Sequence, residues 1–276
     1  MKNIIQKHPN TYTYFLAILL FACALFISVL INKGLIKEYF PFTALILLAF
    51  ATWYLYRREH KSLNEIGFNL KLKNVRFLPL GILVGAGVNL LAKYLRTIYL
   101  GEDFNISTEI NYQNILVAFY AILPTVAVEE FLFRGYLFKK TIELSSVVKA
   151  NIIFSLLFMS IHVLDSYVLQ NPGMIILLTI SIPIGHLMFA TALLKSKSLF
   201  FPIGIHLGNN WATRHLVSVN NNGESIFYIS DKVYFNTWPS FITFILLWNS
   251  IFLIATLVIW KWDKFVSFNF FKNNFS

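Results

Sequence analysis

The sequence predicts an all-α membrane protein, a polytopic transmembrane helical bundle with about eight transmembrane helices. Two observations lead to this fold class. Of the 276 residues, 57% are hydrophobic and only 13% are charged, whereas about 25% of the residues in a soluble domain are charged. The apolar residues also form long blocks, and about 20 apolar residues are enough for a helix to cross the hydrocarbon layer.

Eight blocks are candidate transmembrane helices, because each is an apolar run bounded by polar or basic residues. Their approximate ranges are 12–32, 39–56, 77–98, 113–137, 147–166, 172–194, 199–219 and 236–260. The sequence has no internal repeat and no Gly/Ser-rich linker, so we expect residues 1–276 to form a single membrane domain. The single cysteine, Cys23, lies in the first block, which excludes a disulfide within the chain and a cysteine-based metal site.

The positive charges indicate how the chain is oriented. The net charge is +10, and the Lys and Arg residues gather in short connections between the blocks, as the positive-inside rule describes. The most basic connection, 57–76, is therefore expected to be cytoplasmic. Alternation then places both termini in the cytoplasm and the connections 99–112 and 220–235 outside. Because topology accounts for the charge, we expect a lipid bilayer as the partner and no nucleic acid, and the predicted location is a bacterial inner membrane.

The fourth block contains two adjacent glutamates and an arginine, Glu129, Glu130 and Arg134. Ionisable side chains inside membrane helices are costly and are usually functional. Glu130 and Arg134 are four residues apart, so they share a helix face and can form an ion pair. Glu129 is rotated from Glu130 by about 100°, and we expect it to be the reactive carboxylate that faces the bundle interior. The competing interpretation is an ion pair at the cytoplasmic end of the helix, with Glu129 in water.

Two other blocks carry a histidine with a partner four residues away. These pairs are Phe158 with His162 and His206 with Asn210, and each pair shares one helix face. A histidine and an amide on an inward face can donate hydrogen bonds to a developing oxyanion. Taken alone, either pair is also compatible with ordinary packing or with hydrogen bonds between helices.

Together, the three motifs resemble the CPBP family of intramembrane proteases, which includes CAAX prenyl endopeptidases and bacterial abortive-infection (Abi) proteins. The family pattern is EExxxR, then FxxxH, then HxxxN, with one motif per helix. This sequence carries all three in that order, and the resemblance covers roughly residues 60–220. It implies a central protease core within that range.

The resemblance implies an intramembrane endopeptidase that hydrolyses a peptide bond with an activated water. Glu129 and His162 would activate the water, while His206 and Asn210 would stabilise the oxyanion. The side chains that would support the site are Glu130, Arg134 and Phe158. The substrate would be a membrane-embedded or lipid-anchored protein or peptide, as in CAAX-type processing.

The sequence leaves the cofactor open. Glu129, His162 and His206 would form a His₂Glu set, which is a known zinc arrangement with an open position. The helix-borne HExxH signature of zinc proteases is absent from the sequence, and a glutamate-base mechanism needs no metal. Zinc-dependent and metal-independent hydrolysis are therefore equal alternatives.

Two non-proteolytic functions compete with this interpretation. One is a non-catalytic membrane scaffold or bacteriocin-immunity-type protein with the same core, which would not need His162 and Asn210. The other is a proton-coupled transporter, in which Glu129 and the histidines relay protons. The sequence has no inverted repeat of broken helices to support a transporter. A Glu129→Gln variant with normal biological activity would favour the scaffold.

Overall fold

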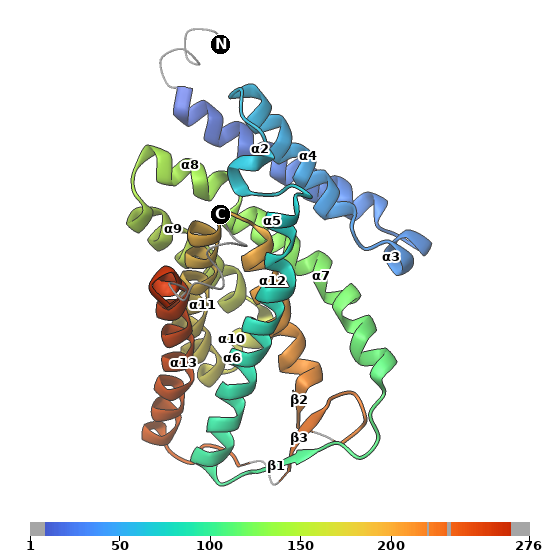
Figure 1. Cartoon of the computed structure of the whole chain (residues 1–276), viewed down its shortest axis with the longest axis vertical. Helices are drawn as coiled ribbons and strands as arrows, with labels where there is room; N and C mark the ends of the chain where they lie inside the picture. The colour runs from blue at the N-terminus through green and yellow to red at the C-terminus, as the bar shows by residue number, and fades with distance from the viewer. Residues whose placement is uncertain (1–8, 220, 231–232, 266–276) are drawn as a thin grey trace.

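The apolar blocks fold into helices, which a computed structural model describes for residues 9–219, 221–230 and 233–265. The helices that match the eight blocks are α2 (Pro9–Ile31), α4 (Thr43–Arg58), α6 (Phe77–Leu100), α7 (Tyr112–Arg134), α9 (Val147–Val163), α11 (Pro172–Ser196), α12 (Phe200–Trp211) and α13 (Trp238–Phe265). Shorter helical segments are α3 (Leu35–Tyr39), η1 (Leu63–Ile66), α5 (Leu72–Val75), α8 (Tyr136–Leu144), α10 (Ser166–Leu169) and η2 (Ala212–Leu216). The strands are β1 (Asp103–Ile106), β2 (Val217–Ser218) and β3 (Phe227–Ser230). The all-α helical bundle predicted from the sequence is confirmed (Figure 1).

Five segments of the described chain are long and apolar enough to cross a membrane. They are Asn10–Ile31, Leu72–Leu100, Tyr112–Leu144, Pro172–Ser196 and Trp238–Lys264. The other three predicted spans correspond to shorter helices, namely α4 with 16 residues, α9 with 17 and α12 with 12. The chain is thus an integral membrane protein, and crossing by these three helices stays a prediction.

The seventh block differs from its prediction as one helix over 199–219. Helix α12 ends at Trp211, the π-helical segment η2 follows, and the chain then becomes extended in β2. Strand β2 runs parallel to β3, and β3 runs antiparallel to β1. The prediction was wrong here because an apolar run does not reveal which of its residues find a strand partner.

The connections gather at two opposite ends of the bundle, as Figure 1 shows for α8 and for the sheet. At the α8 end, Lys61 forms an ion pair with Glu143 at 2.9 Å, and Glu59 accepts hydrogen bonds from Lys140 at 2.8 Å and from Tyr136 at 2.6 Å. Partial burial opposes ionisation of Glu59, but these hydrogen bonds and the nearby ammonium groups outweigh it and lower the pKa of this carboxyl group. The connections 57–76 and 138–149 therefore lie together, as the alternation of charge predicted.

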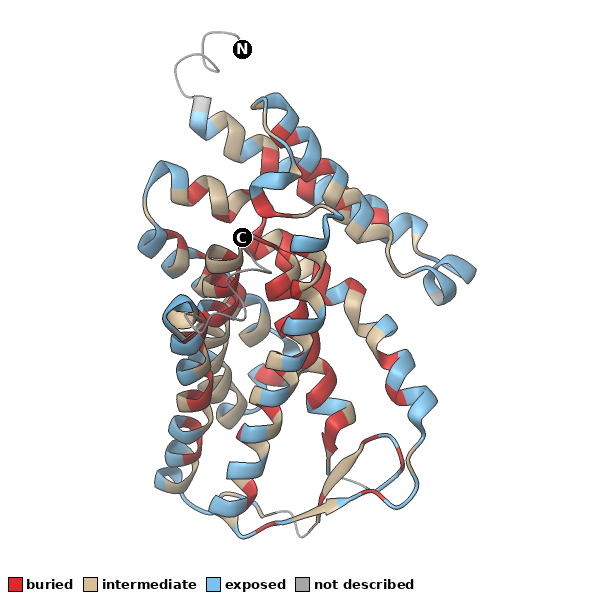
Figure 2. Cartoon of the chain, in the orientation of Figure 1, coloured by how far each residue is buried: buried red, intermediate tan, exposed pale blue. Residues whose placement is uncertain are grey.

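Helix α12 lies in the centre of the bundle, and every residue from Phe201 to Gly208 is buried (Figure 2). It packs against α6 through small residues on both helices. A Cβ atom added to Gly85 of α6 would lie 2.0 Å from the carbonyl oxygen of Ile205, and one added to Gly208 would lie 2.2 Å from that of Ile82. The two backbones are therefore in direct contact, as small-xxx-small packing allows in membranes. This contact fixes the position of the histidine on α12.

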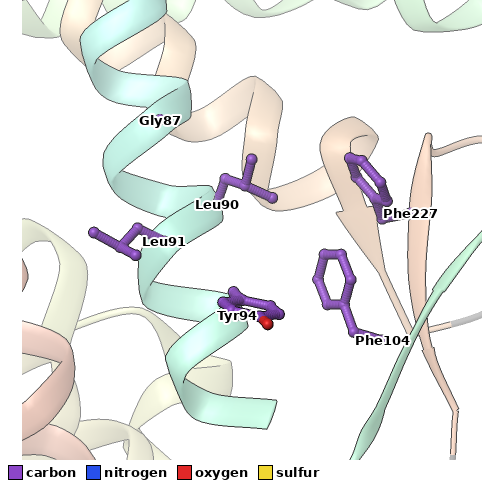
Figure 3. Close-up of a pocket in the computed structure, with 6 residues that line it drawn as sticks. All are labelled: Gly87, Leu90, Leu91, Tyr94, Phe104 and Phe227. Carbon is purple, nitrogen blue, oxygen red and sulfur yellow. The ribbon is translucent and has the colours of Figure 1, made fainter. Parts of the chain in front are cut away.

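An apolar pocket of about 290 Å³ lies between α6 and the sheet (Figure 3). Its lining consists of Gly87, Leu90, Leu91, Tyr94, Phe104 and Phe227. None of the motif residues lines this pocket. The motif residues lie instead on α7, α9 and α12.

Candidate functional site

The acidic motif lies in the last turns of α7, where two of its side chains form a buried ion pair. Glu130 and Arg134 are fully buried, and Arg134 Nη1 donates to Glu130 Oε1 at 3.0 Å. The guanidinium group also lies over two aromatic rings, 4.2 Å from the ring centroid of Phe158 and 5.0 Å from that of Phe189. The ion pair predicted from the four-residue spacing is present, and cation–π contacts add to its stability.

His206 joins this ion pair from α12. Its Nδ1 atom donates to Glu130 Oε1 at 2.8 Å, so one carboxylate oxygen holds both His206 and Arg134. The imidazole ring also stacks on Phe189, with 4.8 Å between centroids and 17° between planes. Because Nδ1 is bound to Glu130, Nε2 is the nitrogen left for chemistry. The sequence interpretation paired Glu130 only with Arg134 and did not foresee that Glu130 orients the histidine.

Glu129 faces the free nitrogen of this histidine. Its Oε2 atom lies 3.6 Å from His206 Nε2, which is longer than a direct hydrogen bond. At this distance two polar groups can hold a common atom between them, such as the oxygen of a water. The side chain of Glu129 is 23% exposed, whereas that of Glu130 is 0% exposed. Glu129 is therefore the more accessible of the two glutamates, although its Oε2 atom is itself buried and has no hydrogen-bond partner in the described part of the chain.

The second motif lies beside the first on α9. His162 Nδ1 donates to the carbonyl oxygen of Phe158 at 2.8 Å, which leaves Nε2 of His162 with its lone pair. The Phe158 ring touches the His162 ring at 4.6 Å between centroids and lies 6.1 Å from the His206 ring. Phe158 thus links the two histidine motifs. In the described part of the chain, His162 forms no hydrogen bond or ion pair with Glu129.

The arrangement does not assemble the three-ligand zinc set. Glu129 and His206 converge, but among the residues described no group of three His, Cys, Asp or Glu side chains is placed to hold a metal ion. The Nδ1 atom of His162 is bonded to the carbonyl oxygen of Phe158. The described residues therefore do not fit a three-ligand zinc site.

Asn210, the last motif residue, is half-buried and belongs to a row of amide side chains. Its Oδ1 atom accepts from Asn209 Nδ2 at 3.4 Å, and Asn209 Oδ1 accepts from Asn89 Nδ2 at 3.2 Å. Sequence reasoning missed Asn89, although a lone amide in an apolar block four residues after Gly85 was a usable signal. It also missed Phe189, because nothing in the sequence marks a stacking phenylalanine among the 28 phenylalanines of the chain.

His186 of α11 is fully buried near the site. We expect packing or a hydrogen bond for this residue, and it packs against Phe138 at 5.8 Å and Phe158 at 6.5 Å between centroids. Neither ring nitrogen has a hydrogen-bond partner in the described part of the chain. The contacts of His186 are therefore those of a packed residue.

A family model matches residues 111–212, a range that contains α7, α9, α12 and every motif residue. Its description is type II CAAX prenyl endopeptidase, Rce1-like. Residues 111–212 are thus similar to Rce1-like CAAX prenyl endopeptidases. The resemblance recognised from the three motifs is thus confirmed, and the Rce1-like match ends just after the HxxxN motif. It covers less than half of the chain, so it leaves the first helices and α13 outside. No curated protein and no solved structure matches the chain.

Proposed function

We propose that this protein is an intramembrane endopeptidase that cleaves a membrane-associated protein or peptide with a water activated by Glu129. The Rce1-like match supports protease activity in general. The observation that carries the mechanism is the 3.6 Å separation of Glu129 Oε2 and His206 Nε2 beside a fully buried ion pair. Glu130 and Arg134 hold the histidine, so its position is set before substrate binds, as electrostatic catalysis requires.

In the proposed reaction, Glu129 takes a proton from the water as the hydroxide attacks the substrate carbonyl carbon. The carbonyl oxygen becomes an oxyanion, to which Asn210 donates from Nδ2. His206 can also donate from Nε2 when its ring is protonated, because its Nδ1 atom already donates to Glu130 at 2.8 Å. Glu129 then returns the proton to the leaving nitrogen as the C–N bond breaks. His162 is assigned to the activation of the same water, through the lone pair of its Nε2 atom.

The proposed substrate is a membrane-embedded or lipid-anchored protein or peptide, with CAAX-type processing as the specific form. Two features support this class. Glu129 lies on a helix within the candidate span Tyr112–Leu144, so a substrate has to reach it from the bilayer or its surface. Aromatic rings and α12 cover the buried side of the site, and Glu129 is the partly exposed residue of the acidic motif.

A cleavage assay in lipid nanodiscs tests this proposal. The probe is a farnesylated, internally quenched peptide with a C-terminal CAAX sequence, and membrane peptides from cells are compared in parallel. Glu129→Gln keeps the side-chain shape but removes the base, so we expect at least a hundredfold loss of cleavage, on the order of general-base catalysis. Glu143→Gln is the matched control, because Glu143 lies in the exposed ion pair with Lys61.

The results separate the candidate functions. Wild type and Glu129→Gln are compared at equal amounts of folded protein. If the variant cleaves the probe and turns over membrane peptides as fast as the wild type, the protease proposal is refuted and the non-catalytic scaffold is favoured. Peptides that accumulate only in Glu129→Gln cells would identify the natural substrate.

We also propose that the α8 end of the bundle faces the cytoplasm, with both termini there, and that the membrane is a bacterial inner membrane. The support is the basic connection 57–76, which lies at that end. In a Cys23→Ser background, cysteines placed at Lys71 and Asn221 should react with an impermeant reagent from opposite faces. Labelling of both from one face would overturn the orientation.

A further inference from the structure

Helix α6 presents a regular row of residues to α12. Gly81, Gly85, Asn89 and Lys93 follow one another at four-residue spacing, so they lie along one helix face. The glycines bring the two backbones into contact. The two polar residues continue the row with hydrogen bonds to the end of α12 and to η2.

A chain of hydrogen bonds links Thr213 to Asn89, Asn209 and Asn210, and Thr213 sets its direction. The hydroxyl group of Thr213 donates to the carbonyl oxygen of Asn209 at 2.8 Å, so its oxygen must accept from Asn89 Nδ2, at 2.9 Å. This acceptor turns the NH₂ group of Asn89 toward α12. The second hydrogen of that group points to Asn209 Oδ1 at 3.2 Å.

The same direction continues along these hydrogen bonds to Asn210. Since the oxygen of Asn209 is used by Asn89, the NH₂ group of Asn209 faces Asn210 Oδ1, at 3.4 Å. The oxygen of Asn210 is thereby turned toward Asn209, and its Nδ2 atom is the end of the amide left to donate elsewhere. Lys93 holds the backbone of η2 and β2 near Thr213, because its ammonium group donates to the carbonyl oxygens of Thr213 at 2.7 Å and of Val217.

We propose that Asn89, Asn209 and Thr213 are positioning residues that orient the amide of Asn210, so that it presents an N–H donor and not its oxygen to the oxyanion. This proposal rests on the proposed function and names a part of the site that the sequence motifs do not contain. An amide has two nearly isosteric ends, and only the nitrogen end can stabilise an oxyanion. Asn89 is 1% exposed, so its hydrogen bonds are made away from competing water.

Isosteric variants at Thr213 provide the sharpest test. Thr213→Val keeps the shape and removes the hydroxyl group that sets the direction of the row, whereas Thr213→Ser keeps the hydroxyl group. Loss of an oxyanion donor lowers kcat by roughly 10²–10³-fold, so we expect that loss for Asn210→Ala. Because Thr213→Val leaves Asn210 in place but with a mixed orientation, we expect a loss of about tenfold in kcat, with KM unchanged and with recovery in Thr213→Ser.

Two readouts distinguish orientation from a general structural effect. In the double variant Thr213→Val with Asn210→Ala, kcat should equal that of Asn210→Ala alone, because the row acts only through Asn210. In protein labelled with ¹⁵N-asparagine, the side-chain NH₂ signals of Asn210, identified by their loss in Asn210→Ala, should shift in Thr213→Val and stay in place in Thr213→Ser.

Two results would overturn the proposal. One is multiplication of the two single effects on kcat in the double variant, and the other is an unchanged NH₂ signal in Thr213→Val. Failure of the proposed function gives a different pattern, in which Glu129→Gln and Asn210→Ala both retain full cleavage of the farnesylated peptide.

Discussion

Replacing Gly85 with alanine tests whether the contact between α6 and α12 positions the site. The added Cβ atom would lie 2.0 Å from the carbonyl oxygen of Ile205 and 2.9 Å from the backbone nitrogen of Asn209. Non-bonded carbon and oxygen atoms lie about 3.3 Å apart or more, so the two helices would have to separate by about 1 Å. Both contacts are to backbone atoms, and no side-chain rotation can relieve them.

The separation has consequences for stability and for catalysis. Overpacking of this kind costs roughly 1–3 kcal/mol, so the melting temperature of the protein in detergent should fall. His206 moves with α12, and its 2.8 Å hydrogen bond to Glu130 is lost when the distance grows by about 1 Å. A misplacement of this size costs on the order of 100-fold in rate, which the farnesylated-peptide assay would measure.

Gly87→Ala is the matched control on the same helix. A Cβ atom at Gly87 meets nothing within 4 Å, and alanine in a helix is about 0.5–1 kcal/mol more favourable than glycine. We expect Gly87→Ala to be as stable as the wild type or more stable, with full activity. Equal melting temperatures for Gly85→Ala and the wild type would refute the inference that backbone contact holds α12.

Three further predictions concern buried and charged groups. Glu130→Gln leaves Arg134 buried without a counter-charge and should lower the free energy of unfolding by about 3–5 kcal/mol. Glu129→Gln should change it by less than about 1 kcal/mol, and the reverse ranking in thermal unfolding would contradict a structural role for Glu130 and a reactive role for Glu129. The pKa of Glu59 is lower in the folded protein, so its ionised form stabilises the fold above the unfolded pKa, and this contribution is lost as the pH falls through the folded pKa. The difference in stability between wild type and Glu59→Gln should therefore be constant above about pH 5.5 and shrink below about pH 4, and a difference that grows on acidification would show that the sign is wrong. His186→Leu removes two unpartnered ring nitrogens, so stability should stay equal or rise with cleavage within about twofold of wild type, and a large loss of cleavage would reveal a role in the site.

Spacing within one helix could be read from the sequence, and contacts between helices could not. The pair Glu130 and Arg134 follows from helical geometry alone. The hydrogen bond from His206 to the same carboxylate depends on how α12 sits against α7, which periodicity does not encode. The family resemblance supplied the motif set and grouped His162 with Glu129 and His206, and that grouping stays a prediction, because among the described residues His162 bonds only to the carbonyl oxygen of Phe158.

The end connections show the same limit in a different way. Charge predicted that 99–112 and 220–235 lie at one end, and β1 and β3 do pair there. The sheet itself was not predicted, because its strands have four residues or fewer, too few to show an alternating pattern. Its register pairs Asp103 with Ser230 and joins segments more than 120 residues apart, which only the folded chain reveals.

The shortness of α12 has a consequence for how the protein is made. A helix of 12 residues is about 18 Å long, less than the thickness of the hydrocarbon layer, and it carries a histidine and two asparagines that lipid would not accept. Neighbouring helices must therefore surround α12 and shield its polar side chains from lipid. The ribosome delivers α6, α7 and α11 first, so its neighbours are already in the membrane when α12 emerges. The order of the motifs along the chain is thus also an order of assembly, in which α12 is the last of the motif-bearing helices to join the bundle.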